Sequence, residues 1–291
     1  MKKLLVFQED HFSLRPAQLQ RLARIVPELD LYYGPPGAVT ASMAQEAQVA
    51  VGCPAPDLLA GMPQLMWLHL TKPIYTPYNQ LSLYANPHIT VTKPTGVYAP
   101  SMADYALHTF GEGVARNRDD LSLWGACVTV VGAGAYAWPL MEVLAAMGCH
   151  IRLVRRNLME KPRQAASVAA LADLPALLHT SDFTVICLPV TQETRGLLSE
   201  SFFAQARADS VVCVMGESGL WTPMAEPVPV AFCQADLWAG MSPMPGVFVT
   251  EGQSLCFPGV MDAQCALLEK RLIRYAAGRR QLDALQFFRG Y

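Results

Sequence analysis

The segment from Cys127 to Ala137 constrains the fold of this chain more than any other part of its sequence. Its first part, Cys127-Val-Thr-Val-Val131, is a short apolar run rich in β-branched residues, which is typical of a strand buried on both faces. Gly132-Ala-Gly134-Ala-Tyr-Ala137 comes next. The apolar residues that follow have helical spacing: Leu140, Val143, Leu144 and Met147. The segment therefore predicts a strand, a glycine turn and a helix.

This order of elements is the one that a dinucleotide site needs. The first glycine permits a tight turn, the second lets a pyrophosphate approach the backbone, and a small third residue lets helix and strand pack closely. A glycine pattern alone is weak evidence, but a second strand-like run, Ile151–Val154, follows at the distance of one βαβ unit. We therefore predict a dinucleotide site, with a tight structural turn beside an empty pocket as the alternative. Its predicted contacts are Gly132, Gly134, Ala135, Tyr136 and Ala137.

Strand-like and helix-like patterns alternate along the first hundred residues, which predicts a parallel sheet covered by helices on both faces. The strand candidates are Lys3–Phe7, Leu29–Tyr33, Gln48–Val51, Leu65–Leu70 and Ile89–Thr92. The helix candidates between them are Pro16–Ile25, Met43–Ala47 and Asp57–Ala60. A longer helix is expected at Ser101–Arg116, with Ser101 as its N-cap, and we place the domain junction in it.

The same alternation resumes after the glycine turn. Strands are expected at Ile151–Val154, Thr184–Leu188, Ser210–Met215, Val228–Cys233 and Val247–Thr250. Helices are expected at Leu171–His179, Ser199–Ala206 and Asp262–Ala277.

Charge and cysteine usage exclude several classes of function. The net charge of -2 and the pI near 6.3 give no electrostatic case for binding nucleic acid or an anionic membrane. Met1–Phe7 is cut short by Gln8-Glu-Asp10 and is interpreted as a first core strand rather than a signal peptide, and no later run could span a bilayer. Eight cysteines without paired spacing indicate core thiols in a reducing compartment, so we expect a cytoplasmic protein without a metal site.

Several segments, in this order, resemble the D-isomer-specific 2-hydroxyacid dehydrogenases over nearly the whole chain. They are Val91–Tyr105, Leu123–Gly125, Leu188–Leu197, Leu272–Tyr275 and Phe288–Tyr291. The resemblance implies an α/β protein with two parallel-sheet domains, in which a Rossmann-like cofactor domain is inserted into a flavodoxin-like substrate domain. We expect residues 1–99 and 279–291 to form the substrate domain and residues 100–278 the NAD(P)-binding domain. Relatives are usually dimers joined through their cofactor domains, so we expect a homodimer.

The resemblance also implies further cofactor contacts beyond the glycine turn. These are Leu188, Pro189, Val190, Met215, Gly216 and Asp236. NAD-selective members carry an acidic residue at the end of the second strand, where it accepts bonds from the ribose hydroxyls. Here that strand ends in Arg155 and Arg156, and two cations suit a 2′-phosphate. We therefore predict NADP(H) in preference to NAD(H), with an exposed basic strand end as the alternative.

The groups that active members use on a 2-keto acid are missing from this sequence. Those members clamp the substrate carboxylate with an arginine and move a proton with a histidine paired to a glutamate. Glu217 stands where the arginine belongs, Glu251-Gly-Gln253 where the histidine belongs, and Ala239–Pro243 where the glutamate belongs. No arginine, lysine or histidine occurs from Ala208 to Glu269, so no small shift of alignment restores the cations.

The substrate side departs from the family pattern as well. The segment Trp67–Tyr75 resembles the loop whose backbone N–H groups bind the substrate carboxylate, but Lys72-Pro73 replaces the usual glycine. Proline removes one donor, while Lys72 offers a point charge. The replacement candidates for proton transfer are Glu217, His69, Lys72 and Tyr75. The alternatives are structural roles for His69 and Tyr75 and a solvated loop position for Glu217.

Three hypotheses follow from the sequence. The first is an oxidoreductase that transfers hydride from NADPH to an imine or a neutral carbonyl, with ordinary 2-keto acids as poor substrates. The second is a catalytically inactive descendant that binds a nucleotide and acts as a sensor or partner protein. The third is an ordinary reductase hidden by a misread alignment, against which the missing cations argue.

Overall fold

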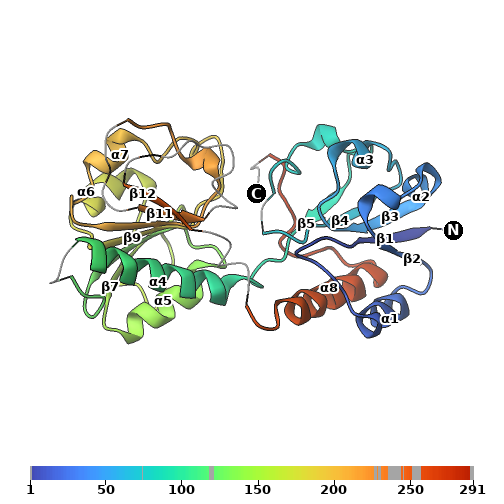
Figure 1. Cartoon of the computed structure of the whole chain (residues 1–291), viewed down its shortest axis with the longest axis horizontal. Coiled ribbons are helices and arrows are strands. Elements are labelled where there is room, and N and C mark those ends of the chain that lie inside the picture. The colour runs from blue at the N-terminus through green and yellow to red at the C-terminus, as the bar shows by residue number, and fades with distance from the viewer. Residues whose placement is uncertain are drawn as a thin grey trace. The chain divides into compact units, whose positions relative to one another are not determined.

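A computed structural model describes residues 2–73, 75–117, 121–225, 228, 231–234, 244, 246–250 and 257–288. The chain divides into two compact units, residues 1–97 with 258–291 and residues 98–257 (Figure 1). Each unit is built around a sheet of parallel strands, which confirms the predicted α/β class with two parallel sheets. None of the helices in the described part of the chain combines the length and hydropathy needed to cross a bilayer.

The first unit contains a five-stranded sheet in the order β2-β1-β3-β4-β5. Its strands are β1 (Lys3–Phe7), β2 (Asp30–Gly34), β3 (Ala47–Val51), β4 (Trp67–His69) and β5 (Thr90–Thr92). This is the flavodoxin-like doubly wound order, in which the carboxyl ends of all strands meet at one edge. Adjacent parallel strands β1, β3 and β4 form its centre.

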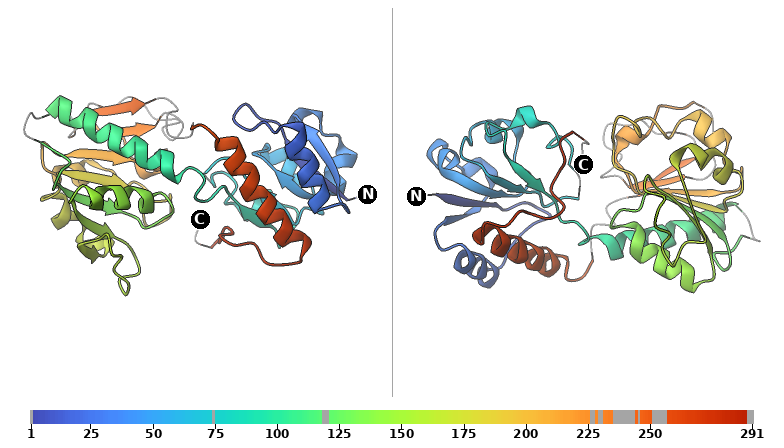
Figure 2. Two further views of the ribbon diagram at one scale, coloured as in Figure 1. Left: turned by 90° about the horizontal axis from the view of Figure 1, so that it is seen from below. Right: turned by 180° about the vertical axis from the view of Figure 1, so that it is seen from behind.

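Alternate residues of these strands face opposite layers of helices, as the two-residue repeat of a strand requires. Leu4 and Val6 belong to a core shared with α1 (Pro16–Ile25) and α8 (Val260–Ala276). Leu5 and Phe7 face the other core, beneath α2 (Ala41–Glu46) and α3 (Pro56–Ala60). Helices α1 and α8 lie side by side on one face of the sheet (Figures 1 and 2).

Helix α8 marks where the structure differs from the domain boundary that we expected. We placed the return of the chain to the first domain at residue 279, whereas the compact unit resumes at residue 258. Cys265, Leu268 and Leu272 of α8 are buried in the same core as β1 and β3. An amphipathic pattern shows that a helix covers a sheet but not which sheet, because both sheets offer an apolar face.

The second unit contains a seven-stranded sheet in the order β12-β11-β10-β9-β6-β7-β8. Its strands are β6 (Cys127–Val131), β7 (His150–Val154), β8 (Ser167–Ala169), β9 (Phe183–Ile186), β10 (Val211–Val214), β11 (Ala231–Gln234) and β12 (Val247–Thr250). Counted from β6, the order is 3-2-1-4-5-6-7, which contains the Rossmann order and reverses between β6 and β9. The sequence did not predict β8, because three residues with a polar start carry no apolar run.

Helices cover both faces of this second sheet (Figure 1). Helix α4 (Ala99–Asn117) packs on α5 (Ala137–Ala146) and on β10. Helices α6 (Leu174–Leu178) and α7 (Glu200–Ala204) bury Leu174, Leu178, Phe202 and Phe203 on the opposite face. Helix α4 begins two residues before the predicted N-cap: Ser101 lies in its first turn, and its Oγ donates to the carbonyl of Tyr98 at 3.0 Å.

Candidate functional site

The glycine turn at the end of β6 has a backbone conformation that only glycine adopts easily. Gly132 has φ +104°, and its N–H donates to the carbonyl of Val154 at 2.8 Å. A Cβ atom built at this position would lie 2.5 Å from the carbonyl oxygen of Cys187. Both the left-handed φ and the close approach of the next strand therefore require a residue without a side chain here.

Gly134 and the start of α5, in contrast to the tightly packed Gly132, border open space. A Cβ atom built at Gly134 would meet nothing within 4 Å, so the space in front of this backbone is open. Helix α5 begins at the fully buried Ala137, and the side chain of its N-cap residue, Tyr136, does not cap it. An uncapped helix N-terminus beside open glycine backbone attracts an anion, because the first N–H groups and the helix dipole both point toward it.

The other residues predicted for the cofactor follow the neighbouring strands of this sheet. Arg155 and Arg156 follow β7, Leu188–Val190 follows β9, and Met215 and Gly216 follow β10. Because β7, β6, β9 and β10 are adjacent and parallel, these ends lie at the same edge as Gly132. The structure thus brings the described members of the predicted set to the point where the strand order reverses. Asp236 lies outside the described residues, as do Glu251, Gly252 and Gln253.

Glu217 follows β10 at this same edge. It is half-buried and is the N-cap residue of a short 3-10 helix, Ser218–Leu220, whose last N–H donates to its carbonyl at 3.0 Å. Its side chain does not cap that helix. A carboxylate is therefore present where the family's arginine is expected.

His69 in the first unit has surroundings that do not suit the proton-transfer role suggested by the sequence. It is 2% exposed, and its Nδ1 lies 2.8 Å from Oγ1 of Thr92, which accepts a bond from Nε1 of Trp67 at 2.9 Å. Burial, and secondarily the Arg271 guanidinium, lower the pKa of His69 to about 3. The ring is therefore neutral near pH 7 and joins β4 to β5, which favours the structural role given above as the alternative for His69.

Tyr75 and Lys72 differ in their exposure. The Tyr75 hydroxyl donates to the carbonyl of Asp283 at 3.1 Å, Nζ of Lys93 lies 4.4 Å from its ring centroid, and burial raises the pKa of this phenol to about 12. Tyr75 therefore anchors the C-terminal segment of the first unit. Lys72 is exposed and can act as the point charge expected from the sequence.

A polar cluster that the sequence did not predict lies at the carboxyl edge of the first sheet. Glu9, Cys53 and Thr71 each lie two residues beyond the end of a strand, β1, β3 and β4 respectively. These strands are neighbours in the sheet, so the three side chains meet. The equal distance of these three residues from their strand ends is a pattern present in the sequence. It indicates a cluster only when the order of the strands in the sheet is known.

The geometry of this cluster is set by a tight turn and by one carboxylate. Glu9 and Phe12 exchange both backbone hydrogen bonds, and the burial of Phe12 fixes the turn that carries His11. Glu9 Oε1 accepts from the N–H of Cys53 at 2.7 Å, and Oε2 accepts from Oγ1 of Thr71 at 2.6 Å. His11 Nε2 lies 3.4 Å from Glu9 Oε2 and 3.0 Å from Thr71 Oγ1. Burial, and then the Glu9 carboxylate, raise the pKa of the Cys53 thiol.

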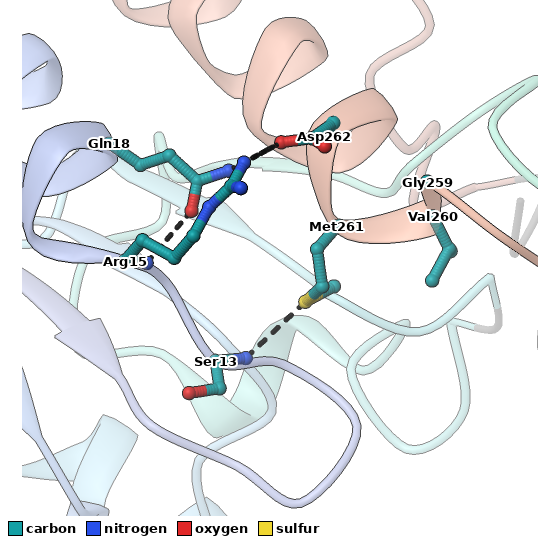
Figure 3. Close-up of a pocket in the computed structure, with 7 residues that line it drawn as sticks. All are labelled: Ser13, Arg15, Gln18, Gly259, Val260, Met261 and Asp262. Atoms are coloured by element: carbon teal, nitrogen blue, oxygen red, sulfur yellow. Dashed lines mark hydrogen bonds and ion pairs between the residues drawn. The ribbon is translucent and has the colours of Figure 1, made fainter.

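A shallow pocket in the first unit lies between the N-terminal ends of α1 and α8 (Figure 3). Arg15 and Asp262 form an ion pair across it, and Nε2 of Gln18 also donates to Asp262 at 3.0 Å. The N–H of Ser13 approaches the sulfur of Met261 at 3.4 Å. The cation and the carboxylate neutralise each other, so the pocket fastens α8 to α1 rather than offering a charge to a ligand.

Comparison with known proteins agrees with this arrangement. Residues 106–222 match the family described as "D-isomer specific 2-hydroxyacid dehydrogenase, NAD binding domain". Erythronate-4-phosphate dehydrogenase of Azotobacter vinelandii is 32% identical over 116 residues, which is 38% of this chain but only 29% of that enzyme.

Solved structures extend the likeness in fold to the whole chain. An NADPH-dependent glyoxylate/hydroxypyruvate reductase from Sinorhizobium meliloti, in complex with NADP and sulfate, has a TM-score of 0.74 at 20% identity and covers 100% of both chains. An acyclic imino acid reductase in complex with NADPH and D-arginine has a TM-score of 0.72 at 11% identity and covers 97% of this chain and 100% of that one.

The matched segment contains the glycine turn, the two arginines and Glu217, and its neighbours in fold are two-domain dehydrogenases and reductases. Over residues 106–222 the chain is similar in sequence to the NAD-binding domain of the D-isomer-specific 2-hydroxyacid dehydrogenases, and over its full length it shares the fold of the solved dehydrogenase and reductase structures.

Proposed function

We propose that this protein is an oxidoreductase with a degenerate active site, which transfers hydride between NADP(H) and a small carbonyl or imine compound that is not held as a 2-keto acid. The observation that carries the proposal is the turn at Gly132, where the open Gly134 and the uncapped start of α5 lie at the reversal of the strand order. Ligands of doubly wound sheets bind at this point. The membership of residues 106–222 in an NAD-binding-domain family supports the same assignment.

Cofactor choice rests on Arg155 and Arg156. We expect NADPH to bind more tightly than NADH, because a 2′-phosphate gains charge-assisted hydrogen bonds from guanidinium groups. The double variant Arg155→Gln/Arg156→Gln should lose roughly tenfold or more in NADPH affinity while NADH binding changes little. Fluorescence titration with both cofactors measures this. Arg163→Gln, which removes an exposed arginine elsewhere in the same unit, is the matched control. Tighter NADH binding by the wild-type protein would contradict the assignment.

The substrate class follows from the charge of Glu217. A carboxylate in place of a cationic clamp repels a 2-keto acid, and the repulsion grows as both groups lose water. We therefore expect little NADPH oxidation with pyruvate or glyoxylate and measurable oxidation with some neutral carbonyl or imine compounds. Absorbance of NADPH over a broad panel tests this, and fast turnover of the two keto acids would refute it. The likeness in fold to an acyclic imino acid reductase supports the inclusion of imines in this panel.

Among the proton-transfer candidates, Glu217 and Lys72 are those whose side chains reach solvent. We propose them for this role, and we assign structural roles to His69 and Tyr75, because both rings are buried and hydrogen-bonded within the first unit.

A nucleotide-binding sensor without catalysis is the second candidate function. The absence of any arginine, lysine or histidine from Ala208 to Glu269 favours it, since the usual clamp and acid would have been lost together. Mass spectrometry of the purified protein distinguishes the two functions when combined with the reductase panel. Co-purified nucleotide without any turnover favours the sensor, and turnover of any panel compound favours the oxidoreductase.

We also propose that the protein is a homodimer of the cytoplasm, joined through the second unit. The family resemblance implies this association, and Trp124 of that unit is 75% exposed. The described cysteines are all unpaired thiols, as expected for a reducing compartment.

A further inference from the structure

We propose that Glu9, His11 and Cys53 form a binding site for one zinc-type divalent ion at the carboxyl edge of the first sheet. Each residue offers one ligand atom, and these atoms all lie within 4.8 Å of one another. A carboxylate oxygen, an imidazole nitrogen and a thiolate sulfur together suit zinc, whereas magnesium and calcium take oxygen ligands alone. Nothing in the spacing of these residues along the chain indicates such a site.

The sheet itself brings the donors together. Glu9 and Cys53 follow the adjacent strands β1 and β3, and the turn closed by Glu9 and Phe12 folds His11 back toward the carboxylate. The Glu9 carboxylate is held from two sides, by the N–H of Cys53 and by the hydroxyl of Thr71. Outer hydrogen bonds of this kind orient a metal ligand before the ion arrives.

Only small movements are needed to close the donors around an ion. Tetrahedral zinc with ligand distances of 2.0–2.3 Å places its ligand atoms about 3.4 Å apart, so donors that lie within 4.8 Å of one another must approach by at most about 1.4 Å. The His11 side chain is 32% exposed and lies on a short turn, so it has room to rotate, whereas the Glu9 side chain is 12% exposed and fixed. Three protein ligands leave a fourth position for water or for an oxygen or nitrogen donor of a small ligand.

The competing explanation is a hydrogen-bonded cluster without an ion. Oγ1 of Thr71 lies 2.6 Å from Glu9 Oε2, 3.0 Å from His11 Nε2 and 3.4 Å from Cys53 Sγ, and could hold the three side chains by itself. The two explanations differ in stoichiometry and spectrum. Zinc and cobalt take the thiolate, so metal binding releases the Cys53 proton and creates a metal–sulfur bond.

Cobalt titration of the chelator-treated full-length protein tests the site with Co²⁺ alone as the probe. We expect one equivalent to bind, with a near-ultraviolet thiolate-to-cobalt charge-transfer band and the visible bands of tetrahedral cobalt, and Zn²⁺ to displace it. Cys53→Ser should abolish the charge-transfer band, and both Cys53→Ser and His11→Gln should weaken binding by roughly a hundredfold, since loss of an outer partner alone costs 10–100-fold. Zn²⁺ should also raise the melting temperature of the wild-type protein and of neither variant.

Matched controls separate this site from adventitious thiol or imidazole binding. Cys149→Ser and His88→Gln remove a half-buried thiol and an exposed ring elsewhere, and both should bind cobalt like the wild-type protein. The proposal is overturned if the wild-type protein binds no stoichiometric cobalt, or if Cys53→Ser binds it unchanged with the charge-transfer band intact. The titration uses neither nucleotide nor substrate, so its result is independent of the proposed oxidoreductase function.

Discussion

Replacement of Gly132 by alanine should destabilise the second unit by about 3 kcal/mol or more and abolish nucleotide binding. The new methyl group would lie 2.5 Å from the Cys187 carbonyl oxygen, and alanine would have to adopt φ +104°. Neither strain can be relieved locally, because the neighbouring atoms are backbone of the adjacent strand end. Because the free energy of unfolding of a native protein is about 5–15 kcal/mol, such a loss removes a large part of the stability of the folded state. Denaturant unfolding followed by circular dichroism measures it.

Gly134→Ala is the matched variant for this prediction. Its Cβ meets nothing within 4 Å, so we expect the unfolding free energy to stay within about 0.5 kcal/mol of wild type. Its methyl group would nevertheless stand where a pyrophosphate must approach the backbone, so NADPH affinity should fall at least roughly tenfold. Equal stability of the two alanine variants would contradict the role of Gly132. Unchanged NADPH affinity in Gly134→Ala would contradict the site of the pyrophosphate.

The buried ring of His69 should make the protein lose stability as the pH falls below 6.5. In the unfolded chain this imidazole takes up a proton near its ordinary pKa of 6.5, whereas in the folded protein it does so only near pH 3. Between these values the unfolded state binds more protons, so the free energy of unfolding decreases by up to about 1.4 kcal/mol per pH unit. Between pH 7.5 and 5 we expect this residue to cost the fold about 2 kcal/mol.

The variant His69→Gln isolates the contribution of this ring. Glutamine keeps an amide that can bond Thr92 but does not titrate, so the difference in unfolding free energy between pH 7.5 and 5 should shrink by about the same 2 kcal/mol. His88→Gln, at an exposed position, should keep the wild-type difference. Identical pH dependence in the wild-type protein and His69→Gln would show that the ring is accessible to protons in the folded state.

The fold could be predicted from local patterns because both sheets are parallel and buried. Strands such as Lys3–Phe7 and Val247–Thr250 and the helix Pro16–Ile25 have the bounds that their apolar runs and helical spacing indicated. The glycine turn indicated a strand before it and a helix after it, because few residues other than glycine tolerate the φ of Gly132. The unit to which α8 belongs could not be predicted from the sequence, because it depends on which of the two apolar sheet faces the helix packs against.

In the candidate site, too, some residues could be proposed from the sequence and others depended on the tertiary structure. Arg155, Arg156 and Glu217 could be proposed from sequence because each lies one to three residues beyond the end of a strand whose place in the family pattern the sequence indicates. The structural alternative for His69 is favoured, because residue parity within β4 turns this side chain to the same face as Trp67, where burial and then Arg271 of α8 lower its pKa. Exposure and pKa depend on packing, which the local sequence does not encode.

The sequence by itself determined the α/β class and the place of the glycine turn, since both depend on residue types at short spacing. A nucleotide site at that turn and the loss of the cationic clamp are predictions from the same residue pattern. The tertiary structure alone decided that His69 is a neutral core residue and that Glu9, His11, Cys53 and Thr71 meet at one edge of a sheet. Residues up to 62 positions apart become neighbours only when parallel strands align their carboxyl ends, and strand order is a property of the whole domain.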